Sequence, residues 1–172
     1  MSDVKKKFSF ALMKAALEFW NDPLYKSEIV NHFYEAIRKV NNKSNVISED
    51  VEINIDNNRV AKEWDHCFPP HVIGHYIMDN ADKYLNDYEA YSNIFDLCTT
   101  TILITKEENT RLRRQTKTRQ GQLILECSLL DKYANANIKL IDGTGPIEDF
   151  PFSLPDSYLD WEKQFIMENK FL

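Results

Sequence analysis

The chain is poor in glycine and has no long apolar run. Only four of its 172 residues are glycine and 43% are hydrophobic, so it can bury a core as one domain or as two small ones. No run of about eighteen apolar residues occurs, the length that a membrane-spanning helix needs. The start, from Met1 to Lys7, lacks the apolar segment of a signal peptide. We therefore expect a soluble, cytoplasmic protein with no membrane partner.

Cysteine is scarce as well. Cys67, Cys98 and Cys127 lie about thirty residues apart, and no Cys-x-x-Cys pair is present to begin a zinc knuckle. The odd count of three argues against a disulfide framework. This usage fits a reducing compartment best.

The charge is unevenly distributed. A net charge of −6 argues mildly against nucleic acid as a partner, because phosphate binding draws on clustered lysine and arginine. Between residues 106 and 119, however, six basic residues stand against two acidic ones, a local balance of +4. The basic residues are Lys106, Arg111, Arg113, Arg114, Lys117 and Arg119. From residue 142 onward, seven acids stand against two lysines, a balance of −5. This asymmetry is typical of a protein with a basic working face, and two solvated helix faces would produce it equally well.

Two amphipathic helices are expected near the start. Apolar residues recur at helical spacing over 8–20 and again over 27–40, where Ser27 is the expected N-cap. The alternation of Val51, Ile53 and Ile55 then predicts a strand. This order is that of a winged helix-turn-helix, so one hypothesis for the region is DNA reading; packing in a small helical core is the other.

The middle of the chain carries a clear strand-to-helix signal. A helix is expected over 72–85 and a loop or short helix over 88–97, followed by a β-branched strand over 99–104. Thr105 and Glu108 then form a capping box, which begins a helix at residue 106.

The last third carries no motif with a chemical role. Its pattern predicts a helix over 123–130, a short strand over 137–141 and a final helix capped by Asp156. We expect it to act as a scaffold or as an arm for a partner.

Two short motifs carry the chemistry. The first is Asp65-His66-Cys67-Phe68-Pro69, an acid beside a histidine in a segment closed by proline. The second is the strand, Thr105 and capped helix that present Asn109 in the first helical turn. Together they resemble the ββα-metal fold of the HNH nucleases, whose halves read Asp-His-x-x-Pro and strand, Thr or Ser, helix with a final Asn or His. The resemblance covers residues 60–118 and is nearest to HNH domains of restriction enzymes and CRISPR effectors.

The resemblance implies a role for each residue. His66 would be the general base that takes a proton from the attacking water. Asp65 and Asn109 would hold one Mg²⁺ or Mn²⁺ ion, because both offer hard oxygen ligands. The basic residues from Lys106 to Arg119 would contact phosphates. The implied partner is double-stranded DNA, cut by a homodimer in which each subunit cleaves one strand, as in a restriction enzyme.

The sequence departs from the family pattern at three points. Thr101 stands near the strand position where the family has its middle Asn, and Asn93 could replace it only in a different layout. A whole predicted helix is inserted between the two motifs, and the cysteines that bind zinc in many HNH proteins are absent. His71 is near enough in sequence to His66 to be an auxiliary ligand or phosphate contact.

Alternatives to these assignments stay open. His71, His75 and Asp79 could line one helix face and bind a metal, but a partly buried structural role for His75 is favoured. Asp65 could also merely fix the tautomer of a structural His66.

The sequence as a whole predicts an α+β protein, mostly helical, with a central ββα-metal element. We expect an N-terminal helical region over 1–58, a nuclease core over 59–120 and a C-terminal helical scaffold over 121–172. The expected function is metal-dependent DNA cleavage. The alternative is a non-catalytic winged-helix regulator or an antitoxin-like protein.

Overall fold

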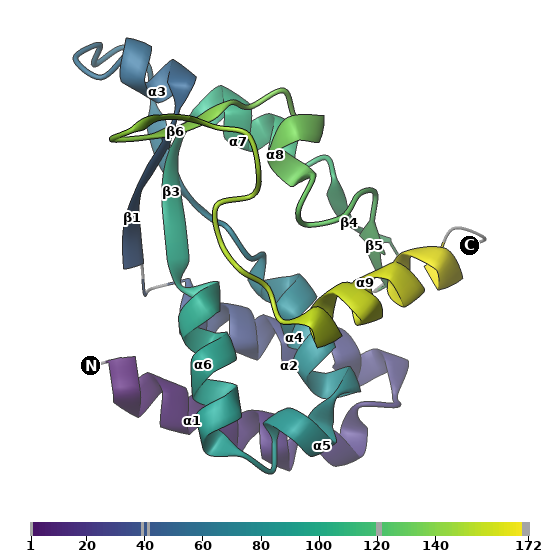
Figure 1. Ribbon diagram of the computed structural model, residues 1–172. Coiled ribbons are helices and arrows are strands. Elements are labelled where there is room, and N and C mark those ends of the chain that lie inside the picture. Colours follow the sequence, from purple (N-terminus) through teal and green to yellow (C-terminus); the bar gives the residue numbers. More distant parts are fainter. Residues whose placement is uncertain (1, 39, 41, 120–121, 170–172) are drawn as a thin grey trace. The chain divides into compact units, whose positions relative to one another are not determined.

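The computed structural model describes residues 2–38, 40, 42–119 and 122–169 (Figure 1). Within these residues the fold is α+β, with nine α-helices and a five-stranded mixed sheet, so the α+β class is confirmed, while the central ββα-metal element stays a prediction. The chain divides into two compact units. Unit 1 consists of Met1–Asn42 and His66–Thr100, and unit 2 of Lys43–Asp65 and Thr101–Leu172. The three consecutive regions expected from the sequence stay a prediction about function.

Unit 1 is built of helices. They are α1 (Ser2–Ala15), the 3₁₀ turn η1 (Leu17–Phe19), α2 (Pro23–Ile37), α4 (Pro70–Asp79), α5 (Ala81–Tyr84) and α6 (Tyr88–Cys98). Their apolar faces meet in a core where Phe33, Ile73, Tyr91 and Phe95 are fully buried. The ring of Phe33 packs edge-on against those of Tyr91 and Phe95, at centroid distances of 6.4 and 6.0 Å. This core joins residues that lie far apart in the sequence.

A glycine lets α2 and α4 approach closely. A Cβ atom at Gly74 would lie 3.3 Å from side-chain atoms of both Phe33 and Val30. Such a contact is tighter than ordinary van der Waals packing. Position 74 therefore has little room for a larger residue.

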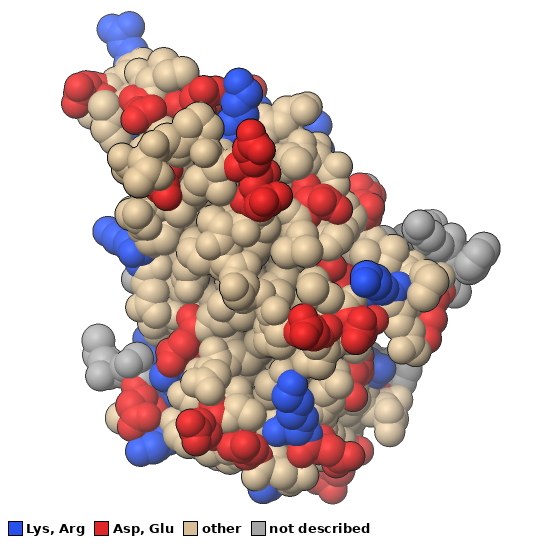
Figure 2. All heavy atoms as spheres, in the orientation of Figure 1, with Lys and Arg blue, Asp and Glu red and all other residues tan. Residues whose placement is uncertain are grey.

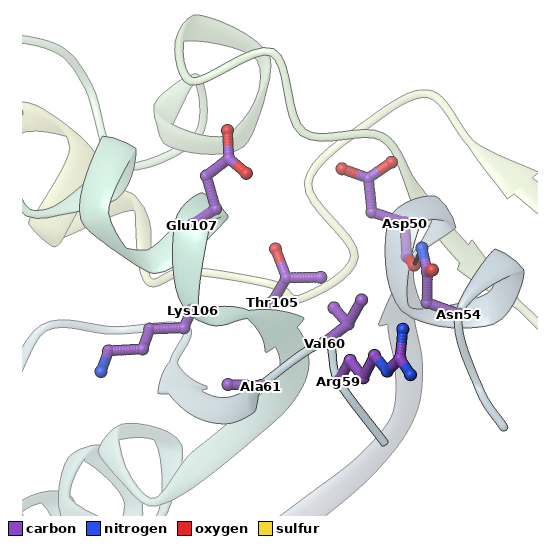
Figure 3. Close-up of a pocket in the computed structure, with 8 residues that line it drawn as sticks. All are labelled: Asp50, Asn54, Arg59, Val60, Ala61, Thr105, Lys106 and Glu107. Atoms are coloured by element: carbon purple, nitrogen blue, oxygen red, sulfur yellow. Dashed lines mark hydrogen bonds between the residues drawn. The ribbon is translucent and has the colours of Figure 1, made fainter. Parts of the chain in front are cut away.

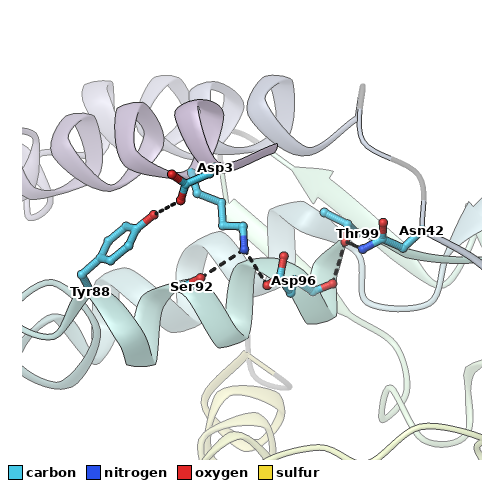
Figure 4. Close-up of polar contacts among 7 residues, drawn as sticks. Asp3, Asn42, Tyr88, Ser92, Asp96 and Thr99 are labelled. Carbon is cyan, nitrogen blue, oxygen red and sulfur yellow. Dashed lines mark hydrogen bonds and ion pairs between the residues drawn. The ribbon is translucent and has the colours of Figure 1, made fainter. Parts of the chain in front are cut away.

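Polar contacts tie α1 to α6 at the edge of this core (Figure 4). The ammonium of Lys6 donates to Ser92 at 3.1 Å and pairs with Asp96 at 2.6 Å. The hydroxyl of Tyr88 donates to Asp3 at 3.1 Å. These contacts are partly or fully exposed, so they fix the register of the two helices more than they stabilise the fold.

Unit 2 holds the sheet and the remaining helices. Its elements are β1 (Asn42–Ser48), α3 (Glu49–Ile53), β2 (Lys62–His66), β3 (Thr100–Thr105), α7 (Lys106–Leu112), β4 (Thr116–Arg119), β5 (Gln122–Leu125), α8 (Lys132–Asn135), β6 (Leu140–Asp142), β7 (Gly145–Ile147) and α9 (Asp156–Asn169). The division between the units falls at the ends of strands, so that Asn42, His66 and Thr100 count with unit 1.

The five-stranded sheet has the order β2-β3-β1-β6-β7. β1 pairs antiparallel with β6, with Ile47 opposite Ile141, and β6 pairs antiparallel with β7. In β3, Ile102 and Ile104 are fully buried. β4 and β5 form a separate antiparallel ribbon. The sheet places β2 beside β3, and β3 runs directly into α7.

Several sequence predictions are confirmed. The strand expected over 99–104 is β3, and the capping box at Thr105 starts α7 at Lys106 as predicted. The expected final helix is α9, in which Asp156, predicted as its cap, is the first residue. The loop or short helix expected over 88–97 is the helix α6, capped by Asp87.

Other predicted elements are wrong. The strand expected at Val51, Ile53 and Ile55 is replaced by the helix α3, whose N-cap Ser48 accepts a hydrogen bond from the Val51 amide. Asp22, rather than Ser27, caps α2, because Pro23 occupies the first helical turn.

Two further elements differ from the prediction. The helix expected over 72–85 is interrupted at Asn80, whose backbone leaves the helical conformation between α4 and α5. The helix expected over 123–130 is not formed; residues 122–125 are strand β5, paired with β4. None of the described helices is both long and apolar enough to cross a membrane.

Candidate functional site

Two carboxylates share one face of β2 in unit 2. Side chains of a strand alternate between faces, so Glu63 and Asp65, two residues apart, follow the same face. Their side chains are 34% and 16% exposed, respectively. A partly buried pair of acids on one strand face needs compensating partners.

The carboxylate of Asp65 is held by two consecutive residues of α8. The ammonium of Lys132 lies 2.8 Å from Oδ2 of Asp65, and the hydroxyl of Tyr133 donates to the same oxygen at 2.7 Å. The side chain of Lys132 is 8% exposed. Asp65 and Lys132 therefore form an ion pair largely shielded from water, in which each neutralises the other.

The four-residue helix α8 is held in place from both ends. In the segment before it, the Ser128 hydroxyl and the Leu129 amide donate hydrogen bonds to buried Glu162 of α9, at 2.6 Å and 2.8 Å. At its end, Nε of Arg111 donates to the carbonyl of Ala136 at 2.8 Å. The C-terminal part of the chain thus positions Lys132 and Tyr133 at β2.

Asn109 reaches the other carboxylate of this face. It lies in the first half of α7, is 8% exposed, and its amide group donates a short hydrogen bond to Oε2 of Glu63. The guanidinium of Arg113, the C-cap residue of α7, lies 3.9 Å from the same oxygen. Glu63 therefore links β2 to α7, while Asp65 links β2 to α8.

The capping box fixes the start of α7. The Thr105 hydroxyl accepts from the Glu108 amide at 3.2 Å, and the Glu108 carboxylate accepts from the Thr105 amide at 2.7 Å. Ser48 donates to that carboxylate at 2.7 Å as well. Because Glu108 is only 2% exposed, these bonds compensate the burial of its charge. The position of Asn109 on α7 follows from this cap.

The histidine predicted as general base ends the strand. His66 is the last residue of β2 and is half-buried. In a regular strand, neighbouring side chains point to opposite faces, so His66 does not share the strand face of Asp65. Trp64, two residues before His66, follows the same strand face as His66. The ammonium of Lys43 lies 4.8 Å from the centre of the Trp64 indole.

The auxiliary residues predicted from the sequence fall in different places. Thr101 is fully buried in β3 of unit 2. Asn93 is exposed on α6 and His71 lies on α4, both in unit 1. The ring of His71 stacks on that of Tyr34 at 4.6 Å, and burial lowers the pKa of His71.

His75 has a structural environment in unit 1. Its ring meets that of Trp20 edge-on at 5.2 Å, and Trp20 donates to Asp79 at 2.9 Å. Burial is the main cause that lowers the pKa of His75 to about 4. In the described part of the chain, no three or more His, Cys, Asp or Glu residues form a group that could hold a metal, so His71, His75 and Asp79 do not make such a site.

The predicted phosphate contacts differ in their environment. Lys106, Arg113 and Arg114 are exposed. Arg111 is already used, because it holds the end of α8 and lies 3.6 Å from Glu107. Lys117 and Arg119 belong to β4, and their side chains lie outside the described part.

An open pocket of about 410 Å³ lies elsewhere in unit 2 (Figure 3). Its lining residues are Asp50, Asn54, Arg59, Val60, Ala61, Thr105, Lys106 and Glu107. The lining carries both signs of charge and includes neither Asp65 nor Asn109. This pocket is distinct from the carboxylate face of β2.

Acidic side chains also gather on the surface around α3, whose first turn holds Glu49, Asp50 and Glu52 (Figure 2).

Sequence reasoning missed three residues of the β2 face. Glu63 could have been found, because its spacing of two from Asp65 in an extended segment places both on one side. Lys132 and Tyr133 could not, since Lys132 is 67 residues away from Asp65 in sequence and no local pattern links them.

Comparisons with protein-family models, with curated proteins and with solved structures found no match.

Proposed function

We propose that the protein is a divalent-metal-dependent endonuclease of the HNH type that hydrolyses phosphodiester bonds in DNA. Asp65 and Asn109 would hold the ion, and His66 would act as general base, which requires its ring, at the end of β2, to turn toward the face of Asp65. The observation that carries the proposal is the meeting of α7 with β2, where Asn109 bonds to Glu63, two residues from Asp65 on the same strand face. Of the two sequence motifs, Asp65 and Asn109 both belong to unit 2, whereas residues 66–69 of the first motif count with unit 1.

The order of elements supports the proposal. β2 lies next to β3 in the sheet, and β3 continues without a break into α7. Two neighbouring strands followed by a helix are the arrangement that the resemblance to the ββα-metal fold implies. The segment from residue 66 to residue 100 counts with unit 1, so β2 up to Asp65, β3 from Thr101 and α7 remain together in unit 2.

The donor atoms of the β2 face fit a hard cation. Glu63 and Asp65 supply carboxylate oxygens and Asn109 supplies an amide oxygen, ligands that suit Mg²⁺ or Mn²⁺ better than zinc. When bound, such an ion would polarise the scissile phosphate and stabilise the leaving oxygen. Asn109 can serve only if its amide turns its oxygen toward the ion, since its nitrogen now donates to Glu63.

The protein groups would supply proton transfer and substrate binding. An imidazole with a pKa of about 6.5 in its ordinary state is suited to take a proton from water near neutral pH. Arg113 and Arg114 are exposed on the turn that follows Asn109 and would contact the phosphates of double-stranded DNA. A homodimer would allow each subunit to cut one strand.

Plasmid cleavage tests the proposal. Purified protein should nick or linearise supercoiled plasmid with Mg²⁺ or Mn²⁺ and remain inactive with EDTA. His66→Ala should abolish cleavage while DNA binding persists, and His32→Ala, at an exposed position of α2, should cleave normally. The proposal is wrong if the wild-type protein, given either metal, cleaves no form of DNA or RNA. Salt-dependent binding that survives His66→Ala, without cleavage by wild type, would favour a non-catalytic DNA-binding protein.

A further inference from the structure

Lys132 occupies the cation position at Asp65. Its ammonium lies 2.8 Å from Oδ2, and both side chains are largely buried. The proposed function places a divalent ion at the same carboxylate. Two cations at one partly buried carboxyl group repel each other strongly, because the local dielectric is well below that of water.

We propose that Lys132 is a built-in competitor for the metal, so that a divalent cation binds at Asp65 only when the ammonium of Lys132 leaves that carboxylate. This inference rests on the proposed function, because it concerns the same site. It assigns the C-terminal part of the chain a role in setting the metal affinity of the nuclease centre.

The surroundings of α8 determine how the exchange can occur. Glu162 holds the segment before α8 and Arg111 holds the carbonyl of Ala136 at its end, so the helix is anchored on both sides. The side chain of Lys132 has a flexible four-carbon stem that can turn away while the backbone stays in place. The hydroxyl of Tyr133, which carries no charge, can keep its hydrogen bond to Asp65 during the exchange.

The charge balance of the β2 face supports competition. Glu63 has Arg113 at 3.9 Å and Asp65 has Lys132 at 2.8 Å, so each carboxylate already has a cationic neighbour. Arg113 is 77% exposed and screened by water, whereas Lys132 is 8% exposed. Lys132 is therefore the stronger obstacle to a second cation.

Calorimetric titration of Mn²⁺ into the full chain tests the inference. The proteins are wild type, Lys132→Met, Lys132→Arg and Asp65→Asn. Lys139→Met is the matched control. Lys139 is 78% exposed, and its ammonium lies 3.3 Å from the carboxylate of Glu49, which is not part of the β2 face. Lys132→Met should bind Mn²⁺ at least about tenfold more tightly than wild type, since the carboxylate loses its competing charge. Lys132→Arg keeps the competing charge and should bind Mn²⁺ as weakly as wild type does. Lys139→Met should also have the Mn²⁺ affinity of wild type.

The outcomes separate this inference from the proposed function. Equal or weaker Mn²⁺ binding by Lys132→Met, with wild-type binding that Asp65→Asn abolishes, overturns the competition but keeps the metal site. Failure of both wild type and Lys132→Met to bind Mn²⁺ overturns the metal site and the competition together.

A second measurement needs no folded Lys132→Met. In wild type labelled with ¹⁵N-lysine, the Nζ signal of Lys132, assigned by comparison with Lys132→Arg, should shift or disappear as Mg²⁺ saturates the site. A signal that stays unchanged at saturating Mg²⁺ would refute the exchange.

Discussion

The buried charges of Asp65 and Lys132 compensate each other. Their side chains are 16% and 8% exposed and 2.8 Å apart. Asp65→Ala leaves a buried ammonium without its acid, which typically lowers the free energy of unfolding by about 3–5 kcal/mol. The double variant Asp65→Ala/Lys132→Met buries no charge at this position and should recover much of that loss. Urea unfolding of wild type, both single variants and the double variant measures this coupling. Additive losses would show that the pair does not act as a unit.

The protonation of His75 makes the stability of unit 1 depend on pH. Burial lowers its pKa from 6.5 to about 4, so the unfolded chain binds a proton more readily than the folded one between these values. The contribution of neutral His75 to the free energy of unfolding is therefore complete above about pH 6.5, and it is lost as the pH falls toward about 4. Between about pH 6.5 and pH 5, the free energy of unfolding should fall by about 1–2 kcal/mol for this reason.

Replacing His75 isolates this contribution. His75→Gln cannot titrate in this range, so its free energy of unfolding should fall less than that of wild type between pH 7 and pH 5. Thermal or urea unfolding at several pH values measures the difference, with exposed His32→Gln as the control. Parallel pH profiles for wild type and His75→Gln would contradict the assignment.

At the scale of elements, the start of α7 depends on one buried carboxylate. Glu108 accepts from the Thr105 amide and the Ser48 hydroxyl, both at 2.7 Å, and is 2% exposed. Glu108→Ala should destabilise the protein by about 2–4 kcal/mol, because it removes the cap and leaves buried donors unsatisfied. Its neighbour Glu107, with a side chain 88% exposed, is a matched control whose change to alanine should cost no more than about 0.5 kcal/mol. Equal losses in urea unfolding would contradict this account of the cap.

Local signals explain which elements the sequence could predict. The start of α7 was predictable because its cap, Thr105 and Glu108, lies within four consecutive residues. The strand before it was predictable from its β-branched residues. At α3, the short alternation of Val51 and Ile53 was misleading, and the stronger signal was Ser48 followed by acids in the first helical turn.

Pairing between segments overrode local pattern elsewhere. Leu123, Ile124 and Cys127 have helical spacing, yet residues 122–125 pair with β4, where Lys117 stands opposite Ile124. Helical periodicity over so few residues does not outweigh antiparallel pairing along the whole of β5. At Asn80, the side chain donates to the Tyr76 carbonyl at 2.9 Å and ends α4, an effect that the apolar stripe of 72–85 could not reveal.

At the scale of the whole molecule, the two units are made of interleaved chain segments. Residues 66–100 join unit 1 because α4 and α6 pack with α1 and α2, contacts between residues far apart in sequence. Local sequence patterns predict consecutive regions and carry no information on packing between helices far apart in the chain. For the candidate site, local motifs pointed to Asp65 and Asn109, whereas Glu63, Lys132 and Tyr133 became visible through the fold.

Direct observation of a bound ion is the sharpest test of the proposed metal-dependent nuclease site on β2. Crystals of the full chain soaked in MnCl₂ and measured near the manganese absorption edge would locate the ion by its anomalous signal. We expect a peak about 2 Å from oxygens of Asp65 and Asn109, the range for hard divalent cations. We also expect that Asp65→Asn crystals lose the peak. A manganese peak that avoids both residues, or the absence of any peak at saturating Mn²⁺ in an open crystal lattice, would contradict the proposed site.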